Sequence, residues 1–166
     1  MSDGDDSYNG VLGAVPYAFR AAESRLFRSY AVVGSLVALV AALAFLVSLM
    51  ITLSDTLAGS VGTFSFSRAF IIFVGLLVVG PLIAPILSVA YRRRTGTSDV
   101  SYEFRMGVLG YLFVLALYLM LVVTAPPEYR RTRDGALAPI VEALYNLDPL
   151  VGVVPPVAVA VAIYWL

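Results

Sequence analysis

Four long apolar segments, none of which contains Asp, Glu, Lys or Arg, constrain this chain more than any other feature of its sequence. They are residues 31–53, 69–90, 106–125 and 149–166. A helix of about 20 apolar residues is long enough to cross a hydrocarbon core roughly 30 Å thick. The segments therefore predict four transmembrane helices, without the intramembrane charges that mark ion paths and proton relays.

Three residue types are missing, since the chain has no Cys, no His and no Lys. Their absence excludes disulfides, thiolate metal sites, Ser–His and Cys–His dyads, and lysine Schiff bases. Most membrane enzymes and cofactor carriers use at least one of these side chains. We therefore expect no enzyme, no cofactor and no bound metal. The zero formal net charge argues against a nucleic-acid partner.

The segments outside the apolar runs have patterns of their own. Residues 1–10 are polar and acidic, which is typical of a disordered tail. Residues 11–30 carry apolar side chains at helical spacing and predict an interfacial helix; the alternative is an extension of the first transmembrane helix. Residues 135–147 predict a second amphipathic helix. The first apolar run is longer than a signal-peptide core, so we expect it to be retained as an anchor.

Small residues indicate where helices pack. Gly34, Ala38 and Ala42 follow one another at intervals of four residues in the first apolar segment, and Gly107 and Gly110 open the third. Spacing of this kind lets two membrane helices approach closely. These five residues are our candidates for helix packing, within the protein or against a partner.

Glycine and proline interrupt the second and fourth apolar segments. Gly80, Pro81 and Pro85 lie in the former, and Pro155 and Pro156 lie in the latter. Proline removes a backbone donor and bends a helix, so we expect helices that are broken or kinked at these positions. Paired broken helices point to a transporter site, although such a site also needs converging polar groups.

Arginine supplies every basic side chain and predicts the orientation. Seven arginines flank one side of the predicted spans (Arg20, Arg25, Arg28, Arg92, Arg93, Arg94 and Arg105), and four flank the other (Arg68, Arg130, Arg131 and Arg133). This excess predicts that both termini are cytoplasmic. The triplet of residues 92–94 is a candidate site for anionic lipid headgroups; the alternative is a simple orientation signal.

Two stretches resemble a known group of proteins. YNGVLGAVPYAFRAAESRLFRSY (residues 8–30) and GALAPIVEALYNL (residues 135–147) are similar to those of a small multi-pass membrane protein family of halophilic archaea that has no assigned function. The resemblance implies a cell-membrane protein in an anionic bilayer at high salt. It supplies no active-site residue.

Together these patterns predict an all-α integral membrane protein with four transmembrane helices and two interfacial amphipathic helices. The expected role is that of a non-enzymatic structural or accessory subunit, whose partners are membrane lipids and other membrane subunits or further copies of itself. The alternative is a small transporter or channel built on the second and fourth spans. A polar cavity between those two spans would favour this alternative.

Overall fold

The structure is a computed structural model that describes residues 10–56, 61–130 and 138–166. Within these ranges the chain is entirely helical, without strands. Its helices are α1 (Gly10–Ala21), α2 (Arg25–Thr56), α3 (Val61–Arg94), α4 (Val100–Val123), the 3₁₀ turn η1 (Pro127–Tyr129), α5 (Ala138–Tyr145) and α6 (Pro149–Trp165). Most of the expected tail and the first residues of the expected helix 135–147 lie outside the described ranges.

Three helices are long and apolar enough to cross a membrane, in agreement with the first three predicted spans. Their apolar stretches cover Arg25–Ser54, Phe66–Arg94 and Val100–Val123. The fourth predicted span corresponds to α6, which has 17 residues and meets α5 at an angle of 102°. If α5 and α6 are taken as one bent span, the number of candidate spans rises to four.

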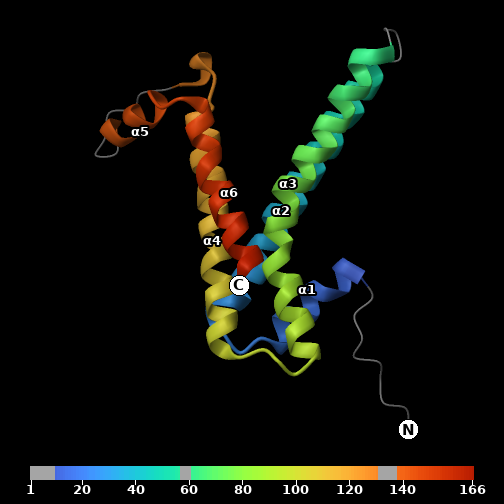
Figure 1. The fold of residues 1–166 in the computed structure, drawn as a ribbon, viewed down its shortest axis with the longest axis vertical. Coiled ribbons are helices and arrows are strands. Elements are labelled where there is room, and N and C mark those ends of the chain that lie inside the picture. Colours follow the sequence, from blue (N-terminus) through green and yellow to red (C-terminus); the bar gives the residue numbers. More distant parts are fainter. Residues whose placement is uncertain (1–9, 57–60, 131–137) are drawn as a thin grey trace.

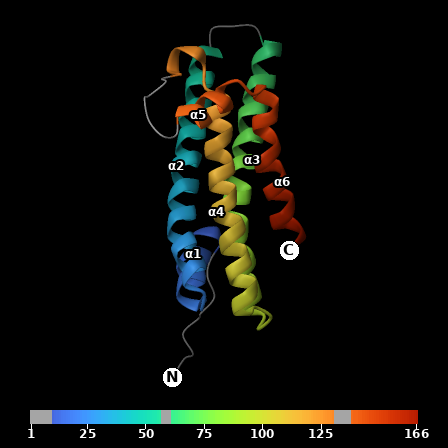
Figure 2. The ribbon, with the colours of Figure 1, turned by 90° about the vertical axis from the view of Figure 1, so that its left-hand side faces the viewer.

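The long helices form a V (Figure 1). The most extensive contacts join α2 to α3 and α4 to α6, and these two pairs are the arms of the V. The arms meet at the end that contains α1 and the link from α3 to α4, which we call the basal end. They diverge toward the distal end, where α5 projects sideways from the bundle (Figures 1 and 2).

Buried side chains gather in the basal part of the V. One cluster includes Phe27, Tyr30 and Met106, and a second, farther along the arms, joins Ala38, Leu82, Phe113 and Ile163. Large apolar side chains cover much of the remaining surface. Phe66, Leu76 and Leu121, for example, are each about 70% exposed. Contiguous exposed apolar surface of this extent is compatible with a membrane location.

The predicted interfacial helix over residues 11–30 does not form as one helix. It ends at Ala21, and α2 begins at Arg25, so the last part of this segment extends the first candidate span. The Ser24 hydroxyl accepts a bond from the Phe27 N–H (3.4 Å), as an N-cap does. Helix α1 buries Ala14 and Ala18 completely and packs against α2 and α3, and Ala22, directly after its end, is also fully buried.

Two of the packing candidates, Gly34 and Gly110, border one aromatic ring, that of Tyr30. A Cβ atom added at Gly110 would lie 2.2 Å from the Tyr30 ring, and one added at Gly34 would lie 2.7 Å from it. At Gly107 an added Cβ would lie 2.5 Å from Leu26 and 3.1 Å from the backbone of Phe27. Only glycine permits α2 and α4 to approach this closely around the ring.

Beyond Ala38, the buried face of α2 departs from the predicted row of small residues. Ala38 is buried, but Ala42 is exposed, and the contact surface of α2 continues through the half-buried Ala41 and Phe45. The reason is the helical repeat of 3.6 residues, because a strict spacing of four drifts around the helix axis. Ala42 therefore lies outside the internal packing face.

The prolines do not break the helices, so the expectation of broken helices is wrong. Helix α3 continues through Pro81 and Pro85, and α6 continues through Pro155 and Pro156. Each proline removes a single backbone donor, and neighbouring bonds keep the helix intact. Figure 1 shows that α3 instead bends near its middle. There the Tyr30 hydroxyl donates to the Leu82 carbonyl (2.6 Å), in the turn between the two α3 prolines.

We predict that Gly110→Ala destabilises the protein by about 1–3 kcal/mol, because the new methyl group overpacks the buried Tyr30 ring. The matched control is Gly80→Ala, since nothing lies within 4 Å of a Cβ at that exposed position. Thermal unfolding in detergent, followed by circular dichroism, measures both variants. Equal melting temperatures would show that the contact between Tyr30 and Gly110 does not constrain the fold.

Candidate functional site

The most elaborate polar arrangement in the described ranges lies at the basal end, around Glu103. Local sequence places this residue. Asp99 caps α4, with its carboxylate accepting from the Tyr102 N–H (2.6 Å), so Glu103 falls in the first turn of the helix. Gly96 adopts a φ of 70° in the link from α3, a conformation that glycine adopts without strain. The chain reverses there and brings Arg93 opposite Glu103.

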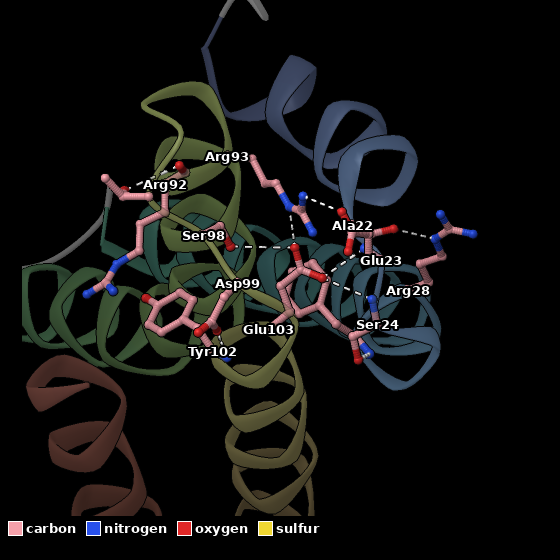
Figure 3. A network of polar contacts seen from close by, with 12 residues as sticks. Ala22, Glu23, Ser24, Arg28, Arg92, Arg93, Ser98, Asp99, Tyr102 and Glu103 are labelled. Atoms are coloured by element: carbon pink, nitrogen blue, oxygen red, sulfur yellow. Dashed lines mark hydrogen bonds and ion pairs between the residues drawn. The ribbon is translucent and has the colours of Figure 1, made fainter.

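Glu103 is fully buried and accepts bonds from three parts of the chain (Figure 3). Its Oε2 accepts from the backbone N–H groups of Glu23 (2.8 Å) and Ser24 (2.9 Å), in the turn between α1 and α2. Its Oε1 accepts from Arg93 Nε and, at 3.5 Å, from the Ser98 hydroxyl. Arg93 also pairs with Glu23 through Nη1 at 2.9 Å. We call Glu23, Arg93 and Glu103 the basal triad.

The electrostatics of the triad favour an ionised Glu103. Burial opposes ionisation, and the hydrogen bonds from Arg93, Ser24 and Glu23 offset this cost. The carboxylate also lies at the N-terminus of α2, where the helix dipole favours negative charge.

The triad is suited to holding the fold together. The acceptor oxygens of Glu103 already have donors, and its side chain has no exposed surface, so it has no open face for a substrate. Sequence reasoning missed this residue because it assigned the whole stretch 91–105 to a loop. The available signal was the run SDVSYE, in which Asp99 is a helix cap and an acid follows in the first turn.

Two members of the arginine triplet are engaged within the protein. Arg92 lies over the Tyr102 ring at 3.9 Å and donates to the carbonyl of Leu166 (3.2 Å), so it ties the end of α6 to the basal end. Arg93 belongs to the triad. Arg94 is the most exposed of the three. The structure thus gives Arg92 and Arg93 internal contacts in addition to any contact with lipid.

An apolar cleft lies between the arms of the V. It has a volume of about 610 Å³ and is lined by side chains of α2, α3 and α4, including Ala41, Ala44, Val78, Leu117 and Tyr118. Tyr118 contributes the only hydroxyl among the lining side chains. We call this space the distal cleft.

A second and smaller cleft lies between α3 and α6, where the candidate proline positions suggested a site. Its volume is about 380 Å³, and Gly80 and Pro81 line it together with Ala84, Ser88 and Tyr164. Pro85 and Pro156 are buried, and Pro155 is half-buried. The lining side chains carry two hydroxyl groups and no charge. Across the described residues, no group of three or more acidic side chains is arranged to hold a metal ion.

Comparison with known proteins identifies the family but not a role. The chain belongs to a family described as "Domain of unknown function (DUF8056)", whose match covers residues 1–166. No curated protein and no solved structure matches the chain. The family assignment agrees with the expectation of a family without an assigned function.

We predict that Glu103→Gln lowers the free energy of unfolding by about 3 kcal/mol, because it leaves Arg93 without its buried counter-charge. Glu23→Gln is the matched control. Its side chain is 62% exposed, so its loss should cost less than about 1 kcal/mol. Denaturant or thermal unfolding in detergent compares the two, and equal effects would contradict a dominant role for the buried carboxylate.

Proposed function

We propose that this protein is a non-enzymatic membrane subunit that receives a transmembrane helix of another membrane protein in its distal cleft. The single observation that carries the proposal is the cleft itself, an apolar space of about 610 Å³ between three helices that are long enough to span a membrane. Its lining residues come from α2, α3 and α4, and the two arms to which these helices belong diverge toward the distal end (Figure 1).

The lining favours a helix as the occupant. Ala41 and Ala44 lie on the α2 wall, where their small side chains permit close approach of a second backbone. In a bilayer, helices associate through packing and not through exclusion of water, so a preformed concave surface is where a partner gains contacts. Lipid acyl chains are the competing occupant, and the test below separates the two.

The charge distribution supports an orientation with the basal end in the cytoplasm. Of the described charged residues at this end, seven are arginines and three are acidic: Glu23, Asp99 and Glu103. A cytoplasmic excess of arginine is the usual pattern in membrane proteins. The haloarchaeal origin that the sequence resemblance implies would set this basic end against an anionic bilayer.

Transport is the weaker candidate. The cleft between α3 and α6 lies where a transporter site was expected, and Ser88 and Tyr164 line it. However, α3 and α6 remain helical through their prolines, so they lack the unwound segments that coordinate substrates in transporters. Two hydroxyl groups without a charge give a solute or ion few ligands.

Photocrosslinking in the cells that produce the protein tests the proposal. A benzophenone amino acid at Leu117, which lines the cleft, should crosslink to a transmembrane segment of one other membrane protein, and a crosslink to a second copy of this chain alone would contradict the proposal. Adding Ala44→Trp should reduce this product to roughly a tenth, because about 1.4 kcal/mol of lost packing is a tenfold change. Leu43→Trp is the matched control on the lipid-facing side of α2, and it should leave the product unchanged.

Two further results would contradict the subunit proposal. If Leu117 crosslinks to lipid alone, the cleft is an acyl-chain site and the subunit proposal fails. If both tryptophan variants reduce the protein product equally, the effect does not come from filling the cleft, and the proposal fails as well.

A further inference from the structure

A pocket at the basal end combines two arginines with apolar walls. It lies where the start of α2 meets the start of α4, and it has a volume of about 630 Å³. Arg25 and Leu26 line it from α2, Val100, Phe104 and Arg105 line it from α4, and Glu23 adds a carboxylate at its edge. Neither the distal cleft nor the basal triad uses Arg25 or Arg105.

The pocket lining carries two guanidinium groups, those of Arg25 and Arg105, against one carboxylate, that of Glu23. Glu23 pairs with Arg93 at 2.9 Å, and Glu103 behind it is held by the same guanidinium. Among the described residues, neither Arg25 nor Arg105 forms an ion pair with an acidic side chain. Arg105 makes one contact, from Nε to the Ser101 carbonyl at 3.3 Å, and Arg25 is exposed.

The apolar walls place the pocket at a membrane boundary. Arg105 directly precedes the apolar segment 106–125, and Arg25 lies six residues before the segment 31–53. Phe104 is 50% exposed and Val100 is 47% exposed, so apolar surface lies beside the two guanidinium groups. A ligand that fits must present an anionic group to the arginines and an apolar part to Phe104 and Val100.

We propose that this pocket binds the phosphate headgroup of one anionic phospholipid, with the acyl chains running along α4 beside Phe104. Guanidinium groups recognise phosphate oxygens through paired N–H donors, and basic residues near a bilayer surface attract anionic lipid. The headgroup site thus lies at Arg25 and Arg105, and the internally engaged Arg92 and Arg93 are not part of it.

Native mass spectrometry of the full chain, purified in a mild detergent, measures the site directly. Phosphatidylglycerol and phosphatidylcholine with identical acyl chains are titrated against the wild type, Arg25→Gln/Arg105→Gln and Arg20→Gln/Arg94→Gln. The last variant is the matched control, because it removes two exposed basal arginines that do not line the pocket. All four arginines have exposed side chains, and circular dichroism checks that both variants fold.

The wild type should bind one phosphatidylglycerol in preference to phosphatidylcholine. The pocket variant should lose about 25-fold in affinity for phosphatidylglycerol, since each basic residue contributes about fivefold. The control should change by less than about twofold. Equal losses in the two variants, or equal binding of both lipids by the wild type, would overturn the site.

Inorganic phosphate distinguishes a lipid from a soluble anion. If phosphate at the same concentration displaces phosphatidylglycerol completely, the apolar walls contribute nothing and the assignment to lipid is overturned. If phosphate fails to compete, the assignment to lipid is supported. The lipid proposal requires a membrane location, but it does not depend on what occupies the distal cleft. Its test is therefore independent of the test of the subunit proposal.

Discussion

One buried carboxylate connects parts of this chain that are about 80 residues apart. Glu103 accepts bonds from the turn between α1 and α2 and from Arg93 at the end of α3, while it belongs to the start of α4. Removing a carboxylate from water is costly unless donors replace the lost solvent, and here backbone and guanidinium donors do so. The four helices that meet at the basal end therefore hold a fixed arrangement there.

The distal half of the molecule presents mainly apolar side chains on its described surface. Glycine contacts around Tyr30 hold α2 and α4 together near the base, whereas the surfaces farther along are apolar and exposed. The basal end is fixed by polar bonds and close packing, and the distal end presents concave apolar surface. This division is the basis of the proposal that the distal cleft receives a helix.

The apolar segments predicted the helices well because length and hydropathy alone decide whether a segment is compatible with a bilayer. The small residues Gly34, Gly107 and Gly110 fall at close contacts for a similar reason, since only tight packing makes glycine useful in a helix. The expectation of broken helices at the prolines was wrong, because a proline can bend a helix without breaking it. The sequence pattern around residues 22–24 did not reveal the end of α1.

The basal triad could not be found from sequence spacing, because its three members come from three separate parts of the chain. Arg93 appeared as one of three equivalent arginines, and nothing local distinguishes it from Arg92 or Arg94. The distinction arises only when the turn at Gly96 and the cap at Asp99 orient the end of α3 against α4. The distal cleft is likewise a product of the angle between the arms, which no local pattern encodes.

The central claim is that the basal end is closed and the distal end is open in a bilayer. Double electron–electron resonance measures it directly, because the chain has no cysteine and accepts paired spin labels without background. In liposomes, labels at the distal pair Met50 and Leu121 should lie farther apart than labels at the basal pair Val32 and Leu112. A distal distance as short as the basal one would show that the arms close, and it would contradict the account.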